Sequence, residues 1–274
     1  MAEPREHAQL LQCGQDYLRA VEAHEPARAA LNSNVRCTHN GRAVKAGEGF
    51  WRELTRFASR QSFADPVSGQ VVMLGAAETR ADLFPYSIRL RIVDGRISEV
   101  ETLLSSSNRG HFAAVDQLLK PDVLYDAPVP ASRGCQDRDQ LQRLADSYWT
   151  ALNESDRSLA NFGYRCDRYA NGKRITNSLE LLLSPDAAVH TVASLITATR
   201  PARPKVLERR FPVIDLERGV VISFAAVEFQ KPPNAARKDF GAFYICALVK
   251  LVDGEFRMVD HIHEILPPGT RSGW

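Results

Sequence analysis

The sequence has no run of about 18 to 20 apolar residues, the length that a membrane-spanning helix needs. Its opening residues, MAEPREHAQLLQ, carry charges and a proline where a secretory signal needs an apolar segment. The five cysteines include no CxxC pair, which indicates neither a disulfide framework nor a zinc ribbon. These absences predict a cytoplasmic protein with reduced thiols and no membrane partner.

Several motifs of known chemistry are also missing. The chain contains no Walker loop, GxGxxG, HExxH or GxSxG, so nothing supports a nucleotide site, a zinc protease or a serine hydrolase. Neither sign of charge is in excess, because 35 Lys and Arg residues balance 33 Asp and Glu residues to a net charge of +2. The basic residues are spread along the chain, and we therefore expect no nucleic-acid partner.

The overall composition is typical of a globular protein. The chain has 274 residues, of which 44% are hydrophobic and 25% charged. This length and composition suit one large domain or two modest ones, with enough apolar surface for a sizeable core.

The clearest local pattern is a hairpin over residues 244–266. Two runs rich in β-branched residues flank Asp253-Gly254, a pair that favours a two-residue type I′ turn. Strict alternation from this turn predicts one core-facing set: Ile245, Ala247, Val249, Leu251, Phe256, Met258, Ile262 and one carboxylate, Asp260. It places Tyr244, Cys246, His261 and His263 on the opposite face. A bulge after Met258 would reverse the positions of the histidines.

Residues 86–104 repeat the pattern of this hairpin. They contain the same VDG turn and have Glu101 at the position that matches Asp260. A further hairpin repeats as well, since four residues align without gaps on four others: Asp65, Gly69, Val71 and Glu78 on Asp215, Gly219, Val221 and Glu228. Matches in the same order predict an internal duplication.

The duplication predicts two units, residues 1–107 and 108–274, joined near the polar stretch 105–111. Helical spacing of apolar residues predicts helices within 5–31, at 47–57 and at 138–152, and the rest of each unit is predicted as hairpins. Residues 181–207 have no counterpart in the first unit and form an insertion. Helices followed by antiparallel hairpins are typical of an α+β fold, with the helices packed on one face of a curved sheet.

At this point the sequence resembles known families. Each unit is similar to a nuclear transport factor 2-like, or SnoaL-like, cone, the fold of ketosteroid isomerase and scytalone dehydratase. The whole chain also resembles a tandem family of unknown function whose second half carries NG, RRFPVxDxxRG and a terminal GxxSGW, here Asn171-Gly172, residues 209–219 and residues 269–274. The resemblance implies two tandem cones, each with an apolar pocket between sheet and helices, and chemistry that needs no cofactor.

Asp260 is the first catalytic candidate. Burial among apolar side chains would raise the pKa of its carboxyl group and make it a general acid or base near neutral pH. The alternatives are a structural carboxylate paired with Arg168 or Arg210, or a solvent-exposed side chain. Tyr148 resembles the tyrosines that polarise a substrate oxygen in ketosteroid isomerase and scytalone dehydratase, although a buried structural tyrosine fits equally well.

The remaining candidates are weaker. His261 and His263 could serve as a base, could hold a metal only with a third ligand that the sequence does not indicate, or could form an outer contact between the two units or between copies. In ketosteroid isomerase the general base lies at the end of the strand that corresponds to residues 165–171. Asn171 is nearest to that position here, and an amide cannot act as a base. Asp167 or Tyr169 could take this role instead. The candidates for substrate binding are Arg168, Arg210, Tyr244, Asn171 and Trp149. No metal site is predicted.

The sequence thus favours a cofactor-independent lyase or isomerase in the second unit. The expected chemistry is dehydration, retro-aldol cleavage or a double-bond shift on a small, apolar, oxygenated and possibly aromatic molecule. The alternative is a non-catalytic module that binds a small molecule or a protein, and a homodimer is compatible with both.

Overall fold

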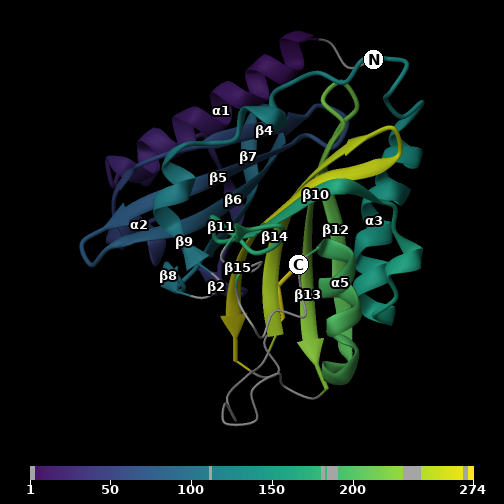
Figure 1. Cartoon of the computed structure of the whole chain (residues 1–274). Coiled ribbons are helices and arrows are strands. Elements are labelled where there is room, and N and C mark those ends of the chain that lie inside the picture. Colours follow the sequence, from purple (N-terminus) through teal and green to yellow (C-terminus); the bar gives the residue numbers. More distant parts are fainter. Residues whose placement is uncertain (1–3, 111–112, 180–182, 184–190, 231–241, 268–270) are drawn as a thin grey trace.

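The computed structural model describes residues 4–110, 113–179, 183, 191–230, 242–267 and 271–274 (Figure 1). The first sheet contains seven strands: β1 (Leu31–His39), β2 (Arg42–Val44), β3 (Leu54–Phe57), β4 (Gln61–Asp65), β5 (Gln70–Thr79), β6 (Leu83–Val93) and β7 (Arg96–Leu104). The second sheet contains six: β10 (Phe162–Ala170), β11 (Lys173–Arg174), β12 (Pro204–Asp215), β13 (Val220–Phe229), β14 (Ala242–Val252) and β15 (Glu255–Leu266).

Helices and short strands complete the described chain. The α-helices are α1 (Pro4–Glu22), α2 (Phe50–Glu53), α3 (Arg138–Glu154) and α5 (Val192–Ala198). The 3-10 helices are η1 (Pro26–Arg28), η2 (Val115–Leu119), η3 (Val123–Tyr125), η4 (Arg157–Leu159) and η5 (Arg200–Ala202), and β8 (Arg109–Gly110) pairs with β9 (Ala113–Ala114).

The two sheets have the same plan. Their strand orders are β2-β1-β7-β6-β5-β3, with β4 also paired to β5, and β11-β10-β15-β14-β13-β12. In each sheet the first long strand pairs in parallel with the last one, β1 with β7 and β10 with β15, and the other pairs are antiparallel. The fold is therefore α+β, with two curved sheets that each carry helices on one face, as the sequence predicted.

The sheets lie face to face between two outer layers of helices. In Figure 1, α1 covers the outside of the first sheet, while α3 and α5 cover the outside of the second. Apolar side chains fill all three spaces, and the central cluster joins the two sheets through residues such as Phe63, Val72, Phe224 and Leu248. Each long strand thus has a helix-facing side and an intersheet side.

The hairpin turn forms as predicted. Val252 pairs with Glu255, and both Asp253 (φ 57°) and Gly254 (φ 71°) adopt positive φ, which a type I′ turn requires. Asp94 and Gly95 repeat this geometry in the first sheet, with φ of 50° and 72°.

The register beyond the turn differs from the expectation. Leu251 pairs with Phe256, but Lys250 pairs with Met258, so Arg257 is an extra residue in a β-bulge. From Met258 onward the predicted faces are reversed, because one inserted residue moves every later side chain to the other face. Asp260 therefore lies opposite Leu248 rather than Ala247, and His261 takes the place opposite Ala247.

One other expectation needs correction. The predicted helix at 47–57 is only the single turn α2, followed directly by β3. In the polar stretch after β7, the Ser106 hydroxyl donates to Glu264 Oε1 at 2.9 Å. In the insertion, α5 and η5 are formed and β12 begins at Pro204, while residues 180–182 and 184–190 lie outside the described residues.

Two asparagines that end the parallel strands have structural roles. Asn40 makes two hydrogen bonds to the backbone of Leu104. The Asn40 Nδ2 donates to the Leu104 carbonyl and the Asn40 Oδ1 accepts from the Leu104 amide, both at 2.9 Å. Asn171 brackets His263 in the same way, at 3.3 and 2.9 Å, and also donates to Ser105 Oγ at 2.9 Å. Its side chain is fully buried and its amide is engaged at both ends, so it holds the end of β15 in place.

We expect Asn171→Ala to lower the free energy of unfolding by about 2 kcal/mol, because it leaves buried backbone groups without partners. Chemical denaturation of the variant measures this loss. Asn40→Ala is the matched variant in the first sheet and is expected to lose less, because its amide makes fewer hydrogen bonds. An unchanged stability of Asn171→Ala would contradict the bracing role.

Candidate functional site

Five of the predicted site residues gather on the helix-facing side of the second sheet. Tyr148 and Trp149 come from α3, Arg168 from β10, and His261 and His263 from β15; we call them the helix-facing cluster. The His261 ring stacks on Trp149 with centroids 5.9 Å apart and meets the edge of Tyr148 at 5.5 Å. The bulge at Arg257 produces this arrangement by turning both histidines toward α3.

Arg168 determines the protonation of His261. Its Nη2 lies 3.0 Å from His261 Nδ1, and since a guanidinium only donates, Nδ1 must accept. The imidazole proton is then on Nε2. Burial, followed by the charges of Arg168 and His263, lowers the pKa of His261 well below its usual value, so the ring is neutral.

By hydrogen-bond geometry, three buried polar atoms in this cluster lack a partner within the described chain: Tyr148 Oη, Arg168 Nε and His261 Nε2. The Arg168 guanidinium lies close enough to the Tyr148 hydroxyl to offset part of the rise that burial causes in the pKa of Tyr148. Tyr148 is fully buried and His261 is 1% exposed. All three atoms can donate a hydrogen bond, and an unpaired buried donor costs about 1 to 3 kcal/mol. Among the described side chains, no carboxylate forms an ion pair with Arg168 either. The cluster therefore offers hydrogen bonds to an acceptor, above all to a negatively charged oxygen.

His263 completes the cluster with a different property. It is 8% exposed and packs edge-on against Phe243 at 5.1 Å. Burial, helped by the charge of Arg168, lowers its pKa to about 4. A neutral imidazole at physiological pH can accept a proton, but a pKa this low makes His263 a weak base unless a negative charge develops beside it.

The sequence did not indicate Ser223, which accepts a hydrogen bond from Trp149 Nε1 at 3.0 Å. This bond fixes the indole beneath His261. A serine inside an apolar strand, VVISFAAV, was the available indication, because a buried hydroxyl needs a partner.

Asp260 lies on the other side of the same strand, and its predicted position in one pocket with Tyr148 is wrong. The carboxyl group faces the first sheet, and Tyr169, its neighbour on β10, lies on the same side. Burial raises the pKa of Asp260 to about 7, and the charge of Asp122 adds to the increase. The expected shift is present, but the side chain belongs to a pocket between the sheets.

Arg210 and Tyr244 also face the first sheet, so they are not beside the histidines. Arg210 forms a bidentate pair with Glu101 at 2.6 and 2.9 Å and contacts Tyr244 Oη at 2.9 Å. The Tyr244 hydroxyl donates to Glu101, which also accepts from Arg89 Nε at 2.5 Å. Glu101 is fully buried and Arg89 is 3% exposed, so this network is an ionic connection between the sheets.

Asp167 lies at the edge of the second sheet. Its Oδ1 accepts from Arg174 at 2.8 Å and from Asn177 at 2.9 Å, which holds the β10–β11 turn. It points to the same side of β10 as Tyr169, away from the helix-facing cluster.

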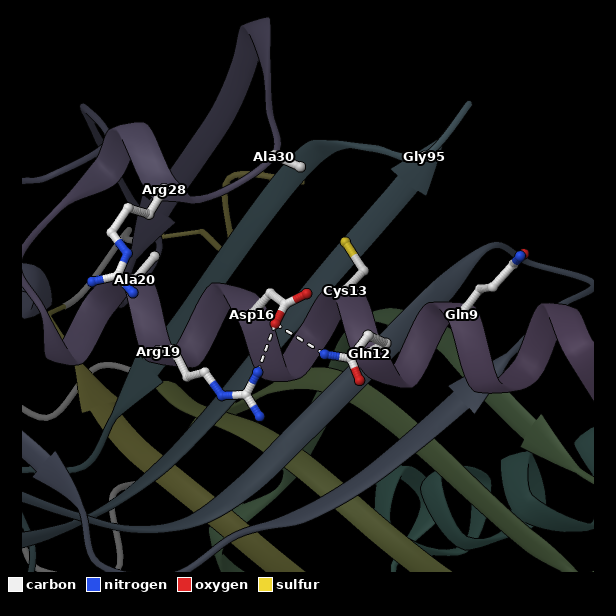
Figure 2. A pocket seen from close by; sticks show the side chains of 9 residues that line it. All are labelled: Gln9, Gln12, Cys13, Asp16, Arg19, Ala20, Arg28, Ala30 and Gly95. Atoms are coloured by element: carbon white, nitrogen blue, oxygen red, sulfur yellow. Dashed lines mark hydrogen bonds and ion pairs between the residues drawn. The ribbon is translucent and has the colours of Figure 1, made fainter.

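No group of three or more His, Cys, Asp or Glu side chains in the described part of the chain could hold a metal ion. Across those same residues, no helix is long and apolar enough to cross a membrane. A surface groove of about 460 Å³ runs along α1 (Figure 2), where Asp16 accepts from Gln12 and Arg19, each at 2.9 Å. Its charged groups are paired, Asp16 with Arg19 and Arg28 with Glu25, and burial raises the pKa of its Cys13 thiol, so nothing there indicates chemistry.

Comparison with known proteins gives a family model and several solved structures. The model of a domain of unknown function (DUF8021) matches residues 134–264, a range that contains the helix-facing cluster. No curated protein matches.

The similar structures include one described as a nuclear transport factor 2-like protein. An NTF2-like protein of unknown function from Cytophaga hutchinsonii is 11% identical, with a TM-score of 0.30 over 35% of this chain and 89% of that one. An LEH-like epoxide hydrolase from M. tuberculosis is 15% identical, with a TM-score of 0.33 over 46% and 84%. A putative ketosteroid isomerase from Kribbella flavida is 13% identical, with a TM-score of 0.30 over 46% and 93%.

Proposed function

We propose that the helix-facing cluster is the active site of a cofactor-independent lyase or isomerase for a small, largely apolar, oxygenated molecule. The observation that carries this proposal is the set of three buried donors, Tyr148 Oη, Arg168 Nε and His261 Nε2, that have no acceptor among the described residues. Buried donors that are fixed in place stabilise an oxygen that becomes negative during a reaction. Their apolar surroundings strengthen that stabilisation.

The reaction that fits is removal of a proton next to a carbonyl group. His263, neutral because its pKa is about 4, takes the proton from carbon. The electron pair of that C–H bond moves into the carbonyl group, and the resulting enolate oxygen accepts hydrogen bonds from the three donors. In a dehydration the enolate then expels the β-hydroxyl group, which takes the proton from His263 and leaves as water; in a double-bond shift His263 returns the proton to a different carbon. As the substrate oxygen becomes negative, the positive charge on His263 is stabilised, which raises the basicity of the ring.

A test needs no knowledge of the natural substrate. 2-Naphthol resembles an enolate when ionised, and its fluorescence distinguishes the phenol from the phenolate. Bound to the cluster, it is expected to ionise at least one pH unit lower than in water, about 1.4 kcal/mol of preference for the anion. Tyr148→Phe and Arg168→Met should each reduce this shift, whereas Tyr164→Phe, at a 93% exposed tyrosine, is the control and should not. Naphthol that stays outside, or ionises as in water, would contradict the proposed anion site.

Catalysis is tested separately from binding. In D₂O, the wild-type protein is expected to exchange the α-hydrogens of small cyclic enones and β-hydroxyketones, followed by proton NMR. His263→Asn should slow exchange by about 100-fold or more, because a positioned base contributes that much. Asp260→Asn should retain it, because Asp260 faces the other side of the sheet. Naphthol binding without exchange of any ketone would favour the alternative, a non-catalytic binding module.

A further inference from the structure

The intersheet pocket is a cavity on the opposite side of the second sheet, separated from the helix-facing cluster by the backbone of β15. Its volume is about 220 Å³, several times that of a water molecule in the liquid, about 30 Å³. Residues from both sheets and from the segment between them line it: Gln61, Leu74, Gly75, Gln117, Leu118, Lys120, Pro121, Asp122, Tyr169, Gly172, Met258 and Asp260.

Asp260 is the polar group that the protein leaves unsatisfied there. Its Oδ1 is buried and has no hydrogen-bond partner in the described chain, and no cation of the described residues forms an ion pair with it. The hydroxyl of Tyr125, a fully buried residue whose pKa the charge of Asp260 helps to raise, is likewise without a partner. The backbone amide of His261 supports the carboxylate and lowers its pKa, but Oδ1 still lacks a donor, preferably a positively charged one.

The surroundings favour a cation over an anion. The titratable groups that face Asp260 are Asp122, Tyr125, Tyr169 and Cys246, and Asp122 adds a second negative charge. Lys120 is the cationic side chain of the lining, and it is exposed, so its ammonium group can remain in solvent. Leu74, Leu118 and Met258 provide apolar walls, and the ring of Tyr169 can contact a cation through its face.

We propose that the intersheet pocket binds a small organic amine, whose ammonium group pairs with Asp260 and whose apolar part packs between Leu74, Leu118 and Met258. The ammonium group supplies the missing donor and the missing counter-charge together. The site draws on both sheets, so an amine bound there stabilises their association. It is independent of the helix-facing cluster.

The test uses benzylamine, with benzyl alcohol as the uncharged probe of the same shape, titrated into the whole chain by calorimetry. Benzylamine is expected to bind at about pH 8, where Asp260 is ionised, and to bind about tenfold more weakly at about pH 6, because the carboxyl group, with its pKa of about 7, must first lose its proton. Benzyl alcohol should bind more weakly than the amine at about pH 8 and show no such dependence.

Two variants decide the assignment. Asp260→Asn should weaken benzylamine binding at least tenfold at about pH 8 and leave benzyl alcohol unchanged. Leu118→Trp fills the pocket without altering the carboxyl group and should remove binding of both probes. His263→Asn should bind benzylamine like the wild type, which separates this site from the proposed active site. The proposal is overturned if the wild type does not bind benzylamine, or if either pocket variant binds it with wild-type affinity.

Discussion

Glu101→Ala is expected to lower the free energy of unfolding by about 3 to 5 kcal/mol, the usual result of removing one partner from a buried ionic group. Glu101 is fully buried and accepts from Arg89, Arg210 and Tyr244 at once. Without it, the guanidinium of Arg210 keeps a hydroxyl as its neighbour but loses its counter-charge. Because Arg210 belongs to the second sheet and Glu101 to the first, the loss weakens the association of the sheets.

Urea denaturation followed by circular dichroism measures this effect, and Asp16→Ala is the matched control. Asp16 also pairs with an arginine, Arg19 at 2.9 Å, but both side chains are more than half exposed, at 52% and 56%. An exposed pair of this kind contributes little, so the control should lose less than about 0.5 kcal/mol. A loss of less than about 1 kcal/mol in Glu101→Ala would show that the network is not the connection we describe.

The sequence was sufficient to predict most strands, both VDG turns and the plan of two sheets with helices. These features depend on local chemistry. Asp-Gly pairs accept positive φ, and apolar residues at every second position are typical of a strand with at least one buried face. Short helical patterns were less informative, since the apolar residues of 50–57 serve a single turn and a strand equally well.

The bulge at Arg257 could not be predicted from alternation alone, because Phe256 and Met258 are both apolar and the pattern continues across it. The spacing of the apolar residues that follow does indicate the bulge. Ile97 and Val100 in the first sheet, and Phe256 and Val259 in the second, lie three residues apart and yet enter the same helix-facing cores. A spacing of three within a strand requires an extra residue. The repeat of this spacing in both hairpins could have revealed the faces of His261 and Asp260.

The composition of the site was predicted better than its geometry. Tyr148, Trp149, Arg168, His261 and His263 were all candidates, and one bulge brings them together. The network around Glu101 could not be predicted from the sequence, because Glu101 and Arg210 are 109 residues apart and meet only when the two sheets pack together. The same packing creates the pocket around Asp260. The bulge at Arg257 thus separates Asp260 from Tyr148, and the long-range packing of the two sheets encloses Asp260 in its own pocket.

Asp260→Asn is expected to stabilise the protein above neutral pH by about 2 to 4 kcal/mol, since burial raises the pKa of this carboxyl group from 3.8 to about 7. Below about pH 4 the group is protonated in both the folded and the unfolded state and has no effect. Between about pH 4 and pH 7 the unfolded state binds fewer protons than the folded one, so stability falls as the pH rises. Above about pH 7 the loss of stability caused by the ionised carboxylate is constant. It is smaller than the whole pKa shift would give, because the side chain keeps partial contact with the pocket.

Urea denaturation at a series of pH values tests this expectation. The wild type should lose stability between about pH 4 and pH 7 in addition to the effects of its other groups, and Asp260→Asn should lack that component because an amide does not titrate. Asp122→Asn is the control, since Asp122 is exposed and contributes to the shift only through its charge. Equal slopes for the wild type and Asp260→Asn would mean that water reaches Oδ1. Saturating benzylamine at about pH 8 should recover part of the lost stability in the wild type alone, because ligand that binds only the folded state shifts the unfolding equilibrium.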